Sequence, residues 1–310
     1  MKNIYFFICL LISFNTYICL GQEKQENSLE GRWDITVNIF NNHYPAWLEV
    51  RHSGFHTLVG RIMFFVGSAR PISKINFSDG KFNFSIPPQW DDGDSDIQFE
   101  GELYGDSIKG SVKYVDNKIY HWIGTKAPSL QRNKTLKLST PITLFNGKDL
   151  SGWYTKGDNQ WIVESGVLKS PKSGVNIISD EKFIDFKLHI EFRYQKGGNS
   201  GIYLRGRYEV QIADSKGLDR LDDQFGSIYG LLSPNEMVAK EPGEWQIYDI
   251  ILIGRKVTII ANGIAVITEQ VIPGITGGAL DANEGEPGPI MLQGDHEPIE
   301  FRNIVLTPYN

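Results

Sequence analysis

Hydrophobic and polar residues alternate along most of this chain, which is the periodicity of β-strands. Between Leu29 and about Arg132, such runs are short, and the clearest cover 33–39 and 97–103. Turn-forming Asp, Asn and Gly residues separate them, as at Ser78-Asp-Gly80. Successive strand side chains point to opposite faces, so this spacing without a helical period predicts a small antiparallel barrel or sandwich.

The same alternation resumes after residue 142 and predicts a second all-β domain. Hairpins are expected over 161–168 and 256–267, and the latter contains Asn262-Gly263, a favoured two-residue turn. The runs are numerous enough for about ten to twelve strands. We therefore expect a double-sheet sandwich in which one sheet curves around a ligand.

Polar side chains that commonly contact ligands occupy alternate positions in three successive runs between residues 186 and 212. If these runs pair as neighbouring antiparallel strands, one sheet surface would carry Glu191, Arg193, Tyr203, Arg205, Glu209 and Gln211. A half-exposed sheet always has a polar face, so a solvated surface with weak ion pairs is the alternative. Tyr, Gln and bidentate Arg favour a binding site over a merely wet surface.

The boundaries of these patterns divide the chain. Residues 1–21 have a basic start, an apolar run and small residues at a cleavage spacing, which predicts a signal peptide cut after Gly21. That apolar run is too short to span a membrane comfortably. We expect a small all-β accessory domain over 22–132, a linker over 133–141 and the sandwich over 142–310. The mature protein would then be exported, to the periplasm or outside the cell.

Composition and charge narrow the classes of function. The only cysteines, Cys9 and Cys19, lie within the expected signal peptide, so the mature chain would have no disulfide or thiolate chemistry. The formal net charge is −6 and no basic cluster occurs, which argues against nucleic acid or anionic membranes as partners. An acidic cluster follows Trp90, but it lacks a glutamate at the twelve-residue spacing of calcium loops. We interpret it as a solvated turn.

An ordered set of motifs extends over residues 142–310. It includes Leu-Phe-Asn-Gly-Lys-Asp-Leu-Ser-Gly-Trp at 144–153, Gly-Asn-Ser-Gly-Ile-Tyr-Leu-Arg at 198–205, Tyr-Glu-Val-Gln-Ile at 208–212 and Gly-Pro-Ile-Met-Leu-Gln at 288–293. This set resembles the 3-keto-disaccharide hydrolase family. The resemblance implies a concanavalin-like jelly-roll sandwich and action on glycosides or disaccharides previously oxidised at C3. The run from Gln293 to His296 departs from the family's usual pattern by one extra residue.

The implied chemistry needs a base, an electrophile and an acid. A ketone at C3 acidifies the C2 proton, so a base can remove it and expel the C1 substituent, after which water adds back. We expect Arg205 to stabilise the enolate, with Arg193 or Arg302 as alternatives. Glu209, Glu191 and His296 are the candidates for the base and the acid.

Other side chains would bind the substrate. We expect sugar contacts from Asn199, Tyr203, Gln211, Tyr229, Gln293 and Arg302, with Tyr229 or Trp245 stacking on a ring face. No cofactor is expected, and a divalent ion bound by Glu191, Glu209 and His296 is the less favoured possibility. The Gly-rich segment 277–287 is interpreted as a flexible loop over the sheet, with a lid carrying Asp281 or Glu284 as the alternative.

Two other classes of function compete with the enzyme. A non-catalytic, lectin-like carbohydrate-binding module would share the fold and need no paired acid and base. A conventional glucanase would need opposed carboxylates along one strand, and the Glu-x-Asp-x-x-Glu arrangement is absent from the sequence. We therefore favour an oligosaccharide or glycoside as the partner, and the sequence does not specify an oligomeric state.

Overall fold

The computed structural model describes residues 28–133 and 135–310. These residues form strands, turns and irregular segments without an α-helix, which confirms the all-β prediction. Accordingly, none of the described segments is a helix long and apolar enough to cross a membrane. The signal peptide predicted for residues 1–21 lies outside the described residues.

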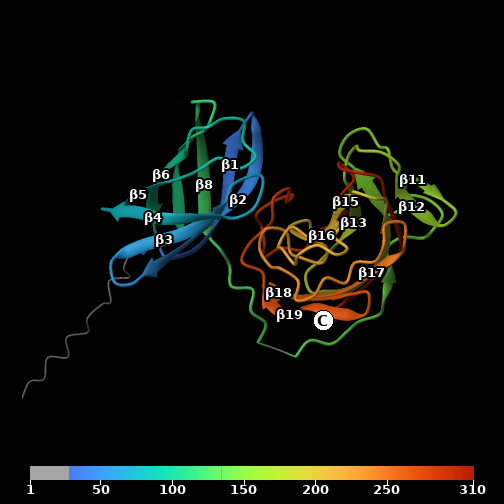
Figure 1. Cartoon of the computed structure of the whole chain (residues 1–310). Helices are drawn as coiled ribbons and strands as arrows, with labels where there is room; N and C mark the ends of the chain where they lie inside the picture. The colour runs from blue at the N-terminus through green and yellow to red at the C-terminus, as the bar shows by residue number, and fades with distance from the viewer. Residues whose placement is uncertain (1–27, 134) are drawn as a thin grey trace, which may run out of the picture.

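The first eight strands close into an antiparallel barrel (Figure 1). Each strand pairs with the next, and the last pairs with the first. The strands are β1 (Gly31–Ile39), β2 (Asn42–Ser53), β3 (Thr57–Met63), β4 (Arg70–Ser78), β5 (Lys81–Ile86), β6 (Ile97–Tyr104), β7 (Ser107–Lys113) and β8 (Ile119–Lys126).

The barrel interior is filled by side chains from alternating positions. In β6, Ile97, Phe99 and Leu103 are buried, and the intervening side chains face outward. A Cβ at Gly101 would lie 2.4 Å from the Phe82 ring, so glycine at this position leaves room for an aromatic core. The rings of Phe84 and Phe99 stack there with centroids 4.8 Å apart. The small barrel is therefore a packed core rather than a pore.

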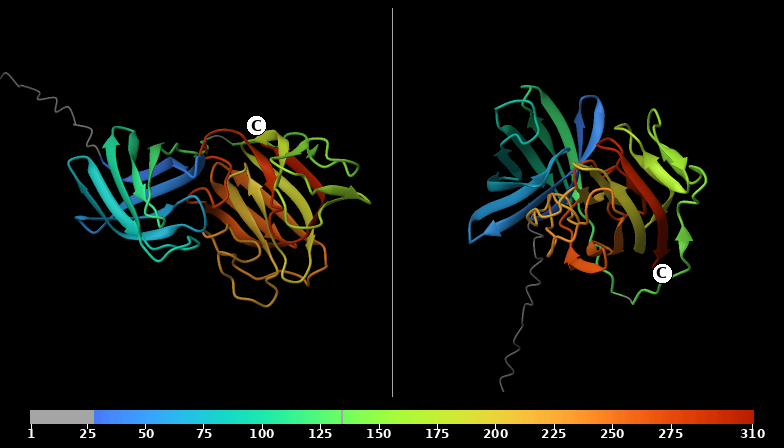
Figure 2. Two further views of the ribbon diagram at one scale, coloured as in Figure 1. Left: turned by 90° about the horizontal axis from the view of Figure 1, so that it is seen from above. Right: turned by 45° about the vertical axis from the view of Figure 1, so that its right-hand side comes forward.

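Two further sheets form the second unit (Figure 2). The five-stranded sheet has the order β10-β13-β20-β15-β16, and the eight-stranded sheet includes the path β11-β12-β21-β14-β17-β18-β19, with β9 paired to β21. The strands are β9 (Ile142–Thr143), β10 (Trp153–Thr155), β11 (Ile162–Glu164), β12 (Val167–Ser170), β13 (Ile177–Phe183), β14 (Phe186–Tyr194), β15 (Asn199–Leu204), β16 (Tyr208–Ala213), β17 (Gln246–Ile253), β18 (Lys256–Ala261), β19 (Ile264–Val271), β20 (Gly288–Leu292) and β21 (Ile299–Pro308).

The core of this sandwich lies between its two sheets. Leu188 and Phe192 of β14 meet Ile202 and Val210 of the five-stranded sheet in one buried cluster. Because strand side chains alternate, the other face of β15 and β16 carries Tyr203, Glu209 and Gln211. The polar residues of these two strands therefore point away from the sandwich core.

The barrel is attached to the sandwich by side chains that reach across their boundary. Trp47 of β2 is fully buried within the sandwich core cluster, and its indole N–H donates to the carbonyl of Ile275 over 2.8 Å. Arg32 of β1 forms an ion pair with Glu284. These contacts hold the barrel beside the polar face of β15 and β16.

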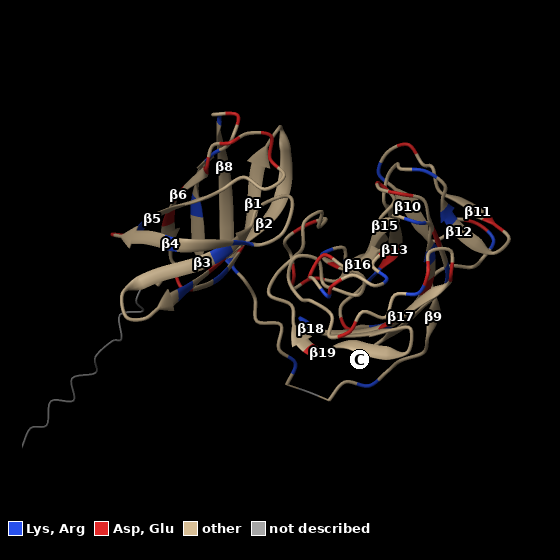
Figure 3. Ribbon diagram, in the orientation of Figure 1, with Lys and Arg blue, Asp and Glu red and all other residues tan. Residues whose placement is uncertain are grey.

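Charged residues do not gather by sign on either unit. Figure 3 shows Lys and Arg interspersed with Asp and Glu along both the barrel and the sandwich. This distribution accords with the modest formal net charge of −6.

Candidate active site

A cavity of about 590 Å³ lies on the polar face of the five-stranded sheet. Its floor comes from β15, β16 and the segments that flank β13 and β20, and the barrel contributes to its wall. The lining residues are Val66, Gly67, Trp90, Asn176, Asn199, Tyr203, Glu209, Gln211, Asp223, Tyr229, Gly277, Gly278, Gln293, Asp295 and His296.

The register of β15 and β16 places the central groups of the cavity. Tyr203 pairs with Glu209, and Gly201 pairs with Gln211. A Cβ at Gly201 would lie 2.3 Å from a carboxyl oxygen of Glu209, so glycine leaves the space that this carboxyl occupies. Glycine at this position of one strand thus leaves room for the carboxyl group of the neighbouring strand.

Glu209 is a buried carboxyl with an unusual proton affinity. The Tyr203 hydroxyl lies 2.8 Å from one carboxyl oxygen and donates to it. Burial raises the pKa of Glu209 from 4.5 to about 8, although the Tyr203 hydrogen bond and the nearby His296 oppose the rise. A carboxyl that titrates near neutral pH suits proton transfer in catalysis.

His296 supplies a second titratable group at the cavity. Its Nδ1 lies 2.8 Å from Oδ1 of Asp295, and both side chains are partly exposed. The hydrogen bond with Asp295 raises the pKa of His296 above its usual value of 6.5, with a smaller opposing effect of burial. The pair therefore presents a histidine that binds its proton more tightly than a free imidazole does.

Amide side chains complete the cavity floor. The amide nitrogen of Gln211 donates to Oδ1 of Asn199 over 3.0 Å. Within the described part of the chain, the buried side-chain oxygens of Gln211 and Gln293 have no hydrogen-bond partner. Unpaired buried acceptors are costly, so these two positions suit hydroxyl groups of a bound sugar.

The structure separates three of the predicted site residues from this cavity. Glu191, Arg193 and Arg302 lie on the eight-stranded sheet, where β14 pairs with β17 and β21 rather than with β15. Glu191 pairs with Arg302 at 2.7 Å on its outer face. The prediction of one continuous polar surface is wrong because the chain crosses between sheets in the turn before β15. Trp245 also lies there, with the Arg302 guanidinium 3.9 Å from its ring centroid.

Arg205 is likewise placed elsewhere than predicted. Strand alternation would set it beside Tyr203, but β15 ends at Leu204 and Arg205 has a φ of 55°. This left-handed conformation ends the alternation. The guanidinium is fully buried and donates to the Tyr208 hydroxyl over 2.9 Å and to the Gly254 carbonyl over 2.8 Å.

The acidic residues of segment 277–287 do not enter the cavity. Asp281 pairs with Arg207 at 2.7 Å. Glu284 is fully buried and accepts a hydrogen bond from the Tyr208 hydroxyl, 2.5 Å away. This segment contributes Gly277 and Gly278 to the cavity instead, so the lid with an acidic side chain is not what the structure shows.

The ion-binding set considered from the sequence is not assembled. Glu191 lies on one sheet, and Glu209 lies on the outer face of the other. Among residues 28–133 and 135–310, no group of at least three His, Cys, Asp or Glu side chains is arranged to hold a metal.

Some of the site residues predicted from the sequence line the cavity. The structure brings together Asn199, Tyr203, Glu209, Gln211, Tyr229, Gln293 and His296. It adds others that the sequence did not single out for the site, namely Val66, Gly67, Trp90, Asn176, Asp223 and Asp295. Asp295 could have been found from its position beside His296. The barrel residues of the lining could not, because no local sequence pattern indicates how the barrel docks on the sandwich.

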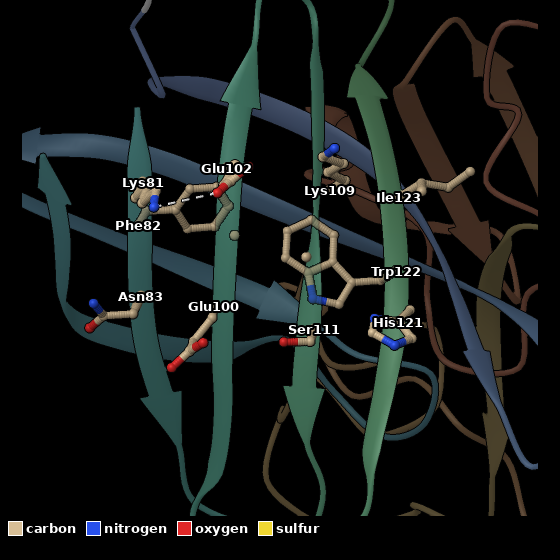
Figure 4. Close-up of a pocket in the computed structure, with 12 residues that line it drawn as sticks. Lys81, Phe82, Asn83, Glu100, Glu102, Lys109, Ser111, His121, Trp122 and Ile123 are labelled. Carbon is tan, nitrogen blue, oxygen red and sulfur yellow. Dashed lines mark ion pairs between the residues drawn. The ribbon is translucent and has the colours of Figure 1, made fainter. Parts of the chain in front are cut away.

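A second hollow crosses the outer face of the barrel over β5–β8 (Figure 4). Its volume of about 580 Å³ is similar, but its polar side chains stand in rows on an open sheet. Lys81 and Glu102 form a pair there at 3.7 Å, with much of the lysine exposed. Since no buried titratable group opens into this hollow among the residues described, the sandwich cavity is the stronger candidate.

Comparison with known proteins finds a family that matches the part of the chain that forms the sandwich. Residues 140–307 match the family model described as a 3-keto-alpha-glucoside-1,2-lyase-like domain. A 3-keto-disaccharide hydrolase from Bacteroides thetaiotaomicron is 35% identical over 94 residues, which cover 26% of this chain and 32% of that protein. The match therefore spans about a third of the curated relative's length.

Solved structures also resemble the chain. A candidate glycosyl hydrolase from Parabacteroides distasonis is 32% identical, with a TM-score of 0.46 and coverage of 57% of this chain and 92% of that one. A second from the same organism is 28% identical, with a TM-score of 0.44 and coverage of 54% and 98%, respectively.

Proposed function

Because the chain belongs to the family of 3-keto-alpha-glucoside-1,2-lyase-like domains, we propose that it cleaves glycosides or disaccharides whose sugar carries a ketone at C3. The observation that carries this proposal is Glu209, a buried carboxyl with a pKa of about 8 that faces the sandwich cavity. Removal of a proton beside a ketone needs a base whose pKa lies near the working pH.

In the first step, Glu209 in its ionised form takes the proton from C2 of the sugar. The electron pair of the C2–H bond moves toward C3, and the ketone oxygen becomes an enolate oxygen. Asn176 lies at the cavity, and its side-chain oxygen already accepts the N–H of Gly294 over 2.9 Å. That bond orients the amide, so we assign its N–H₂ group to the enolate oxygen.

In the second step, the enolate re-forms the ketone and the bond from C1 to the leaving oxygen breaks. The product sugar then has a C1=C2 double bond conjugated with the C3 ketone. The protonated His296, held by Asp295, donates its proton to the leaving oxygen. Addition of water at C1, with return of a proton to C2, completes a net hydrolysis.

A paired-substrate assay tests the reaction. The purified chain should release the leaving group from a 3-keto-glucoside and not from the same glucoside without the ketone. In D₂O, the product should carry deuterium at C2. Equal turnover of both glucosides would contradict the keto mechanism, and turnover without deuterium would favour direct hydrolysis.

A sugar-binding module remains the alternative proposal, because unpaired amide oxygens suit a lectin as well as an enzyme. Binding of the 3-keto-glucoside without release of the leaving group would favour it. A rate that falls on chelation and returns with a divalent ion would add a metal to the mechanism.

We further propose that the protein acts after export and cleavage following Gly21. The basis is the sequence of residues 1–21, with its apolar run and small residues at the cleavage position. N-terminal sequencing of the protein expressed in its host should begin at Gln22, and a chain retaining Met1 in the cytoplasm would contradict export.

A further inference from the structure

The barrel presents an exposed aromatic ring at the rim of the sandwich cavity. Trp90 lines the cavity, yet 72% of its surface is exposed. It belongs to the connection between β5 and β6 and is far in sequence from the residues of the cavity floor. An exposed tryptophan beside a polar cavity is uncommon on a wet surface and typical of a stacking platform.

The segment that carries Trp90 is held on both sides. Gln89 donates to the Ser68 hydroxyl over 2.7 Å and accepts the Ser68 N–H at 3.1 Å. On the other side, Asp91 accepts from the Tyr114 hydroxyl at 2.6 Å and from Arg70 at 3.3 Å. The carboxyl of Asp91 is therefore structural, and it differs from the solvated turn predicted for this acidic cluster.

The ring itself rests on the neighbouring backbone. A Cβ at Gly67 would lie 2.8 Å from Cδ1 of Trp90, so the indole packs against a position without a side chain. Trp90 also lines the same cavity as Tyr229, a residue of the sandwich. One edge of the indole is thus fixed, and most of its surface remains open.

The whole barrel is docked closely enough to hold this ring in position. A Cβ at Gly277 would come 2.6 Å from the carbonyl oxygen of Gly67, and one at Gly230 would come 2.4 Å from Cβ of Ser68. Trp47 anchors the same side of the barrel through its hydrogen bond to Ile275. The loops of the two units therefore touch directly around the cavity.

We propose that Trp90 forms a subsite for the sugar ring of the leaving group. Glu209 and His296, which carry the chemistry, belong to the floor side, whereas Trp90 belongs to the barrel wall. With the 3-keto residue on the floor, the rest of a disaccharide extends toward the barrel. Its apolar C–H face can then stack on the indole. This inference rests on the proposed function of the floor and assigns to the barrel the selection of the leaving group.

Two substrates with the same 3-keto sugar test the subsite. One is a 3-keto-disaccharide, and the other is a methyl 3-keto-glucoside that has no second ring. For Trp90→Ala, the ratio of kcat/KM for the disaccharide to kcat/KM for the methyl glucoside should fall roughly tenfold, the value of one buried apolar ring face. Trp90→Phe should recover part of the ratio, because a smaller aromatic ring keeps some of the contact.

Phe55→Ala is the matched control. Phe55 is 92% exposed in the turn between β2 and β3, at the other end of β3 from the Gly67 loop, and it does not line the cavity. Its replacement should leave the ratio unchanged. An unchanged ratio in Trp90→Ala, or an equal fall in Phe55→Ala, would overturn the subsite.

Binding measurements separate this inference from the proposed reaction. The dissociation constant of the disaccharide should rise roughly tenfold in Trp90→Ala, measured by calorimetry in a Glu209→Gln background. The native protein could turn over neither substrate while Trp90→Ala weakens disaccharide binding. That result would support the subsite and contradict the proposed reaction. If disaccharide binding is absent or insensitive to Trp90, the subsite falls.

Discussion

The sandwich has two polar sheet faces built from the same kinds of residue, and they differ in what covers them. On the eight-stranded sheet, Glu191 and Arg302 pair across neighbouring strands, and part of each side chain is exposed. On the five-stranded sheet, Tyr203 and Glu209 also pair across neighbouring strands, but both are buried. The second face lies beneath loops of the sandwich and the docked barrel.

Whether a polar sheet face is covered decides how its charged groups behave. An exposed pair of opposite charges is largely screened by water and contributes little. A carboxyl removed from water acquires a shifted pKa, as Glu209 does. Alternating polarity therefore identifies a strand, whereas the covering segments decide whether its polar face can become a reactive site.

The largest expected effect is the loss of activity in Glu209→Gln. The amide keeps the shape but cannot accept the C2 proton, so kcat/KM on a 3-keto-glucoside should fall about 10²- to 10⁴-fold. The thermal unfolding midpoint should not fall, because the variant no longer buries an ionisable group. Activity within a few-fold of the native value would show that Glu209 is not the base.

Arg205→Met should lower stability more than catalysis. The substitution leaves the Gly254 carbonyl and the Tyr208 hydroxyl without their buried donor, at a cost of about 2–4 kcal/mol in the free energy of unfolding. Urea denaturation measures this loss. A variant with native stability and a large defect in kcat would instead support the catalytic role that the sequence analysis gave to Arg205.

Tyr203→Phe should move the pH dependence upward. The Tyr203 hydroxyl lowers the pKa of Glu209 by donating to its ionised carboxyl, so its removal raises that pKa further above about 8. The rising limb of kcat/KM should then shift to higher pH, while the falling limb, where His296 loses its proton, should stay in place. A downward shift would mean that the hydroxyl stabilises the protonated carboxyl.

The smallest effect is expected on the uncovered face. Glu191→Gln should change kcat/KM by less than about twofold and the free energy of unfolding by less than about 1 kcal/mol, the usual value of an accessible ion pair. Kinetics and urea denaturation of the same preparation check both numbers. A loss of kcat/KM as large as that of Glu209→Gln would contradict the proposed difference between the two sheet faces.

Local sequence patterns predicted the strands of both units because alternation is a property of neighbouring residues. β6 and β16 are examples, and each lies within a run identified by its periodicity. The pairing of β14 was not predicted correctly, since nothing local distinguishes a turn within a sheet from a crossing between sheets. Arg205 was misplaced because alternation was extended one residue beyond the end of β15.

The site was predictable to the extent that it lies on one hairpin. Tyr203, Glu209 and Gln211 follow from strand alternation and adjacent pairing. The position of Trp90 depends on contacts between residues more than a hundred positions apart, and the docked barrel brings it to the cavity that Tyr229 also lines. Docking of this kind leaves no periodic signal in the chain.

The most direct test of the covered face is the pH dependence of kcat/KM for the native chain and Glu209→Gln on one 3-keto-glucoside. In the native chain, the rate should rise as Glu209, with a pKa of about 8, loses its proton, and it should fall again as His296 loses its own. The rising limb should be absent from the residual activity of the variant. If the same limb persists in Glu209→Gln, another group carries the proton and the assignment of the base is wrong.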